Sequence, residues 1–91
     1  MLNEWDLDEW QSYATNVGLV LQRAREQSGY SQEYVAGNAN ITVYTYRKLE
    51  HGQSNPGSPA NPRLKTLLAI CRVLDITLDE LAPSTFEAGT G

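Results

Sequence analysis

The chain has 91 residues, of which 41% are hydrophobic and 20% charged, as expected for one small globular domain. A single cysteine excludes an internal disulfide, and one cysteine with one histidine excludes a His/Cys zinc site. No apolar run approaches the roughly 20 residues of a membrane span. Met1 to Glu4 lacks the pattern of a secretory signal, so we expect a cytoplasmic protein without membrane association.

The net charge of −4 conceals a division along the chain. Residues 1–14 carry four acidic side chains and no basic one, and residues 75–91 again carry four acidic side chains and no basic one. Residues 15–74 hold all seven lysines and arginines against three glutamates. Because binding to a polyanion depends on the field of one face, the basic middle keeps nucleic acid open as a partner.

The first predicted helix follows an acidic cap at Asp6 or Asp8. Apolar residues recur at three- and four-residue steps from Trp10 to Ala24, and Ser28-Gly29 supplies the end. A break near Asn16–Gly18 is an alternative, with Trp5 and Trp10 in a short extra helix packed on the domain. We treat residues 1–14 as an acidic, helical N-terminal extension.

Two short helices are predicted next. Ser31 caps the first, which buries Val35 and Ala36, and the turn at residues 38–40 uses asparagines that tolerate left-handed backbone. Thr42 caps the second, which runs from Val43 to Glu50 and buries Tyr46 and Leu49. Their separation of about four residues is typical of a helix-turn-helix.

The remainder is a proline-rich loop followed by two helices. Residues 53–62 contain three prolines and are predicted as loop. A helix from Leu64 to Leu74 is expected to bury five side chains: Leu64, Leu67, Leu68, Cys71 and Leu74. Thr77 and Glu80 form a capping box that opens a last turn burying Leu81, and residues 83–91 are expected to be a flexible tail.

Five segments between Val17 and Leu81 resemble the Cro/repressor-type (XRE-like) helix-turn-helix family. In chain order they are Val17-Gly18-x-x-Leu21-x-x-Ala24-Arg25-Glu26-x-x-Gly29, Ser31-Gln32-Glu33-x-Val35-Ala36, Ile41-Thr42-x-x-Thr45-Tyr46-x-Lys48-Leu49-Glu50-x-Gly52, Leu64-x-x-Leu67-Leu68-x-x-Cys71-x-x-Leu74 and Ile76-Thr77-Leu78-Asp79-Glu80-Leu81. The resemblance implies an all-α, five-helix, lambda-repressor-like domain over residues 15–82, with the extra N-terminal helical segment outside it. Asn40 stands where the family has glycine, and the loop after Gly52 is longer than usual.

The resemblance also implies a surface that binds double-stranded DNA. The outward positions of the second short helix are Thr42, Val43, Tyr44, Arg47, Lys48 and His51. Val43, Tyr44 and Lys48 would face bases, whereas Arg47 and His51 would contact phosphate. Gln32 would bridge phosphate and a base-reading side chain. The alternative for each is a solvated side chain without ligand, and for Arg63 and Lys65 that alternative is at least as strong.

The family pattern implies an ion pair between Arg25 and Glu50, which makes Arg25 structural. The function implied is a sequence-specific transcriptional regulator, a repressor that binds an inverted repeat as a homodimer. We expect the dimer contact at Leu78 and Leu81, or at Trp5 and Trp10. The alternatives are an antitoxin that binds a toxin protein and its own promoter, and the DNA-binding part of a larger factor. No catalytic constellation is evident, so we expect neither an enzyme nor a cofactor.

Overall fold

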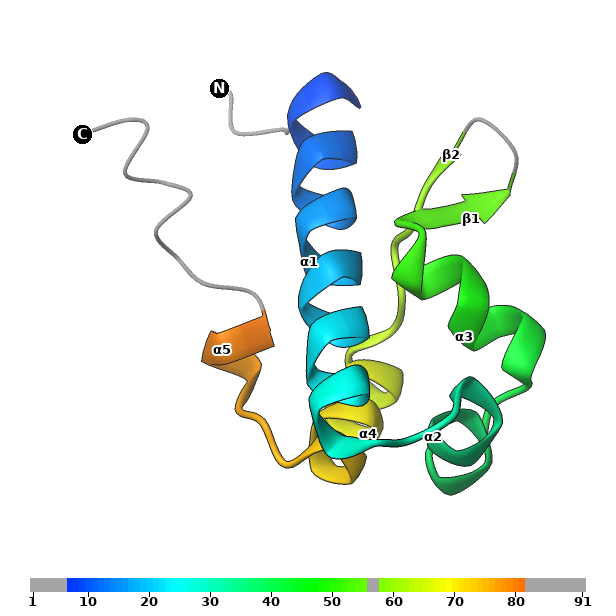
Figure 1. Ribbon diagram of the computed structural model, residues 1–91. Coiled ribbons are helices and arrows are strands. Elements are labelled where there is room, and N and C mark those ends of the chain that lie inside the picture. Colours follow the sequence, from blue (N-terminus) through cyan, green and yellow to red (C-terminus); the bar gives the residue numbers. More distant parts are fainter. Residues whose placement is uncertain (1–6, 56–57, 82–91) are drawn as a thin grey trace.

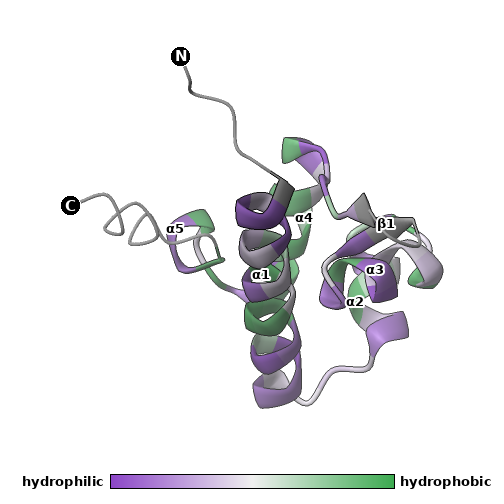
Figure 2. Cartoon of the chain, turned by 90° about the horizontal axis from the view of Figure 1, so that it is seen from above, coloured by the Kyte–Doolittle hydropathy of each residue, from purple (hydrophilic) through white to green (hydrophobic). Residues whose placement is uncertain are grey.

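The computed structural model describes residues 7–55 and 58–81 (Figure 1). Five helices make up most of this part: α1 Leu7–Ser28, α2 Gln32–Asn38, α3 Val43–Glu50, α4 Leu64–Leu74 and α5 Leu78–Leu81. Seen from above, α1 and α4 lie together, with α5 on one side and α2 and α3 on the other (Figure 2). The predicted all-α, five-helix architecture is therefore confirmed.

Helix α1 is continuous over 22 residues, so the break considered near Asn16–Gly18 does not occur. Residues 7–14 are the first turns of this helix rather than a separate one, and Trp5 lies outside the described residues. Gly18 is retained inside the helix because the end of α3 lies directly against it. A Cβ at this position would come within 2.4 Å of the Glu50 carbonyl oxygen.

Local capping interactions start the helices where the sequence predicts them. The Ser31 hydroxyl accepts a hydrogen bond from the Tyr34 backbone N–H at 2.9 Å, and the Thr42 hydroxyl accepts one from Thr45 at 3.1 Å. These bonds satisfy amides that have no partner within the helix. Asn40 has φ of 62°, so asparagine does adopt the left-handed turn between α2 and α3.

The proline-rich segment, predicted as loop throughout, contains a short antiparallel pair of strands, β1 Gln53–Asn55 and β2 Ser58–Pro59. The segment is attached to the start of α1. The indole Nε1 of Trp10 donates to the Ala60 carbonyl at 2.9 Å, and the Ala60 backbone N–H donates to the Gly52 carbonyl at 2.8 Å. The first turns of α1 are therefore tied to the long loop by the bond from Trp10 to Ala60.

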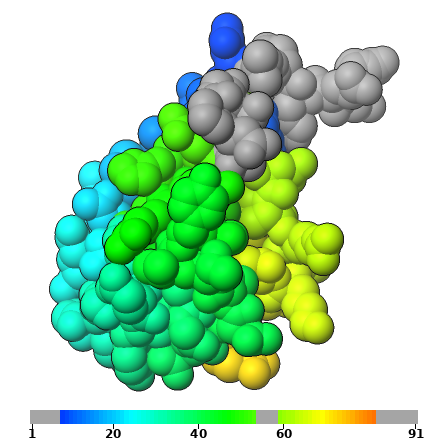
Figure 3. Space-filling view, turned by 90° about the vertical axis from the view of Figure 1, so that its right-hand side faces the viewer, coloured from blue at the N-terminus to red at the C-terminus, as the bar shows by residue number. Residues whose placement is uncertain are grey.

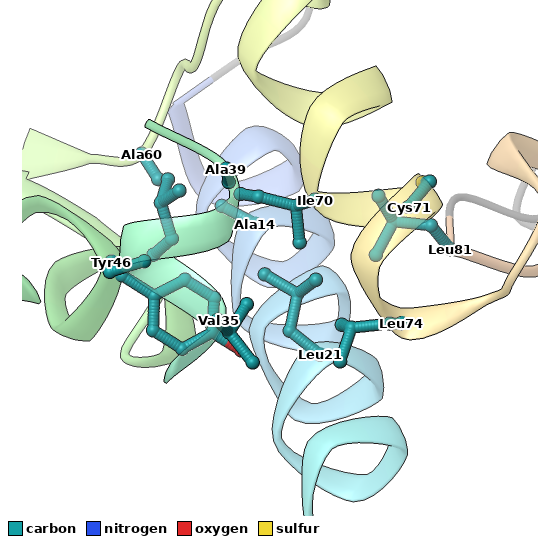
Figure 4. Packing of buried hydrophobic residues seen from close by; sticks show 12 residues of the cluster. Ala14, Leu21, Val35, Ala39, Tyr46, Ala60, Ile70, Cys71, Leu74 and Leu81 are labelled. Carbon is teal, nitrogen blue, oxygen red and sulfur yellow. The ribbon is translucent and has the colours of Figure 1, made fainter. Parts of the chain in front are cut away.

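The core lies where α1, α3 and α4 converge (Figure 4). Its largest fully buried side chains come from all five helices: Leu21, Val35, Tyr46, Ile70 and Leu81. Cys71 is buried among them as predicted, and burial raises the pKa of its thiol, with a smaller contribution from Glu80. A neutral, buried thiol fits a packing role rather than a reactive one.

The apolar stripe predicted for the fourth helix is partly wrong. Leu64 is 60% exposed and Leu68 48%, whereas Ile70 is fully buried. Two neighbouring stripes of α4 are apolar, and periodicity alone does not decide which one faces the core. The stripe that contains Ile70, Cys71 and Leu74 is buried because α4 packs against α2 on one side and α1 and α5 on the other.

Leu81, which the sequence analysis predicts as part of a dimer contact with Leu78, is not exposed on the surface of the single chain. Leu81 has no exposed area, because α5 packs it onto α1 and α4. Leu78 remains 38% exposed on the same helix. None of the helices in the described ranges is both long and apolar enough to cross a membrane.

We predict that Gly18→Ala destabilises the protein, since the added methyl group would overlap the backbone of Glu50 and Leu49. Overpacking of this kind costs about 1–3 kcal/mol. Gly37→Ala is the matched control in α2, where a Cβ would meet nothing within 4 Å. The control should gain about 0.5–1 kcal/mol from helix propensity. Urea unfolding of both variants measures the difference, and equal effects would contradict the close approach of α1 to α3.

Candidate nucleic-acid interface

The α3 helix presents one face to the surface and the other to the core. In the space-filling view it crosses the middle of the molecule, with α2 below it and α4 side chains beside it (Figure 3). Tyr46 and Leu49 are buried, as predicted. The predicted binding residues of this segment share the outer face: Thr42, Tyr44, Arg47 and His51 are exposed, and Val43 and Lys48 are half-buried.

Tyr44 and Lys48 form a pair on this face. The Lys48 ammonium lies 4.5 Å from the centroid of the Tyr44 ring, as their i, i+4 spacing allows. Tyr44 is 65% exposed, so the phenol and the ammonium reach outward together. The pair combines a positive charge with a hydrogen-bonding hydroxyl on the exposed face of the helix.

A chain of charged and amide side chains joins the core to this face. Arg25 on α1 forms a two-pronged ion pair with Glu50 at the end of α3, with Nε–Oε2 and Nη2–Oε1 distances of 2.6 and 3.2 Å. The side-chain Nε2 of Gln32 on α2 donates to Glu50 Oε1 at 3.0 Å. The ion pair that the resemblance implies is therefore present, and it also includes α2.

The Arg25–Glu50 ion pair is buried, so its role is to stabilise the fold. The side chains of Arg25 and Glu50 are only 14% and 4% exposed. Burial by itself raises the pKa of Glu50, but hydrogen bonds from Arg25 and Gln32 outweigh it and hold the pKa below 4.5. The neighbouring Tyr46 hydroxyl finds no hydrogen-bond partner among the described residues, and burial together with the Glu50 charge raises its pKa.

The chain continues outward through Gln32 to Arg47. The side-chain oxygen Oε1 of Gln32 accepts a hydrogen bond from Arg47 Nε at 3.0 Å, so both the oxygen and the nitrogen of the side-chain amide are bonded to protein. Arg47 in turn donates from Nη2 to Glu33 Oε2 at 3.2 Å. The sequence predicts a phosphate contact for Gln32 and another for Arg47, but it does not predict that Arg47 contacts Gln32 and Glu33. Contacts between two helices leave no spacing pattern in the sequence.

Two basic residues beyond α3 are separated by the fold. A groove of about 310 Å³ beside α3 is lined by Lys48, Gln53, Asn61 and Arg63, among others. Arg63 therefore shares a surface with Lys48, whereas Lys65 is exposed on α4 and does not line this groove.

The Thr42 hydroxyl is already bonded within the protein. It caps α3 and forms a 2.9 Å hydrogen bond with the Thr45 hydroxyl.

Comparisons with known proteins agree with the observed fold. A sequence model described as helix-turn-helix matches residues 21–81. A similar solved structure is the restriction-modification controller protein C.AhdI from Aeromonas hydrophila, at 27% identity and a TM-score of 0.68. The match covers 77% of this chain and 97% of that chain. A search of curated proteins found no match.

We predict that Glu50→Gln lowers the free energy of unfolding at neutral pH by about 2–3 kcal/mol, because it leaves the Arg25 charge buried and unpaired. The lowered pKa of Glu50 means that its carboxylate stabilises the fold above pH 4.5. That contribution is lost as the pH falls through the folded-state pKa, so the wild type and the variant should converge in acid.

Denaturant unfolding across an acidic pH series tests this prediction. Glu26→Gln provides the control, since it makes the same change at an exposed glutamate of α1 and should alter stability by no more than about 0.5 kcal/mol. A difference between wild type and Glu50→Gln that persists unchanged on acidification would show that the carboxylate charge is not its cause.

Proposed function

The chain belongs to the XRE-type helix-turn-helix family of DNA-binding transcription regulators, and on this basis we propose that it reads specific double-stranded DNA sequences with α3 in the major groove. The observation that carries the proposal is the division of α3 into a buried face and an exposed face. A major groove accepts one α-helix and exposes the edges of all four base pairs to it.

Each outer residue has a role in this proposal. Val43 would offer an apolar contact to a thymine methyl group, and Lys48 would donate to guanine O6 or N7. Tyr44 would reach a base or a phosphate through its hydroxyl. None of these forms a bidentate pair with a base, so the shape and deformability of the DNA would add to recognition.

Phosphate contacts would position the helix without specifying sequence. His51 and Arg47 are exposed on α3 and suited to this role, with Thr42 at the start of the helix. Gln32 lies in the first turn of α2, where free amides and the helix dipole favour an anion. Arg63 lines the same groove as Lys48 and joins this group, which is drawn from the basic middle of the chain.

We further propose that the protein acts in the cytoplasm as a homodimer on an inverted repeat and represses transcription by occupying promoter DNA. Two half-sites about 34 Å apart would double a contact that is small for one module. Leu78 and the exposed leucines at positions 19, 64 and 68 provide apolar surface for association. Sedimentation that shows only monomer at tens of micromolar, with and without DNA, would contradict the dimer.

We predict that selection from random duplexes at near-physiological salt enriches a two-fold symmetric motif. The Tyr44→Ala/Lys48→Ala variant should lose this enrichment, because it removes both prominent groups of the outer face. Loss of one such base contact typically costs about 1–3 kcal/mol, or roughly fivefold to 150-fold in affinity. Far-ultraviolet circular dichroism would check that the variant remains folded.

Arg23→Ala is the control for the loss of positive charge. Arg23 is exposed on α1 and lines a groove shared with Leu81 of α5 rather than with α3. The Arg23→Ala variant should enrich the same motif as the wild type, with little change in affinity for DNA. Binding that enriches no motif and weakens as the salt concentration rises would show that the protein only binds phosphate through its charge. That result would favour the antitoxin alternative, in which a protein is the main partner.

A further inference from the structure

A carboxylate lies within the surface proposed to meet the DNA backbone. Glu33 is in the first turn of α2, where an acidic residue stabilises the positive end of a helix. Its side chain is 65% exposed and its Oε2 accepts from Arg47 Nη2 at 3.2 Å. The same position that suits the helix places a negative charge where phosphate would approach.

The Arg47 guanidinium is held by two groups of α2. Nε donates to Gln32 Oε1 at 3.0 Å, and Nη2 donates to Glu33. A guanidinium has five N–H donors, so donors remain for a phosphate while the arginine stays on Glu33. The adjacent carboxylate, however, offsets the charge that would attract that phosphate.

The two contacts have different consequences for binding. Gln32 is neutral and is itself bonded to Glu50, so it fixes the position of the guanidinium without altering its charge. Glu33 is charged, and it must either share Arg47 with an incoming phosphate or give up the ion pair. Both outcomes reduce the favourable free energy of binding to the DNA backbone.

We infer that Glu33 is a built-in competitor for the backbone phosphate that Arg47 would contact, and that it lowers the affinity for DNA irrespective of base sequence. The inference rests on the proposed function, which it deepens by giving an acidic residue a defined role at the interface. Arg47 is pre-positioned by Gln32, and its attraction for phosphate is limited by Glu33.

A double-mutant cycle on a random-sequence duplex tests the inference. Glu33→Gln should tighten binding about two- to fivefold, the range expected for an exposed ion pair. It should also steepen the dependence of log affinity on log salt by about 0.9, the contribution of one additional neutralised phosphate. In an Arg47→Ala background, Glu33→Gln should have almost no effect on either quantity.

Asp79→Asn is the matched control. It makes the same change in net charge at an exposed position of α5, which lies on the opposite side of α1 from α3 (Figure 1). This variant should leave both the affinity and the salt dependence near those of the wild type. Thermal unfolding of all variants would confirm that they are folded under the binding conditions.

The possible failures are distinguishable. Wild-type binding that Glu33→Gln does not change would overturn the inference and leave the proposed function intact. An equal gain from Glu33→Gln with and without Arg47 would also overturn it, since Glu33 would then act as a general negative charge. No duplex binding by any of the proteins, at any salt concentration, would overturn the proposed function and the inference together.

Discussion

The placement of the helix-turn-helix depends on the buried ion pair between Arg25 and Glu50. Two charges withdrawn from water are tolerated only when paired and hydrogen-bonded, and here the partners come from α1 and α3, with Gln32 of α2 as a third. The same residue constrains the backbone, because the Glu50 carbonyl lies against Gly18. One residue at the end of α3 thus contacts α1 through both its side chain and its backbone, and α2 through its side chain.

The N-terminal turns of α1 extend this support to the segment after α3. Trp10 donates to the Ala60 carbonyl and Gln11 to the Gly52 carbonyl, at 2.9 and 3.5 Å. The family match begins at residue 21, so these contacts come from a part of the helix outside it. They give the first turns of α1 a role in holding the segment that follows α3, whatever further role their acidic residues have.

Features set by neighbouring residues were predictable from the sequence, whereas features set by packing between elements were not. The caps at Ser31 and Thr42 depend on atoms three residues away, and both were correct. The buried stripe of α4 depends on where α2 lies, and the apolar spacing selected a face that includes Leu64, whereas the structure buries Ile70. At the candidate site, the outer face of α3 followed from spacing, but the contact from Glu33 to Arg47 joins two helices and left no pattern to read.

The separation of α3 into two faces bears on how such a protein can acquire a new target sequence. Tyr46, Leu49 and Glu50 are buried and maintain the scaffold, whereas the exposed Tyr44 and its partner Lys48 can be exchanged with less effect on it. Val43 is partly buried against the core, so its replacements are restricted to similar apolar side chains. Arg47 differs, since its guanidinium is bonded to two residues of α2. A change at position 47 therefore leaves the side chains at positions 32 and 33 without this partner, and we expect these three positions to change together among proteins that recognise different operators.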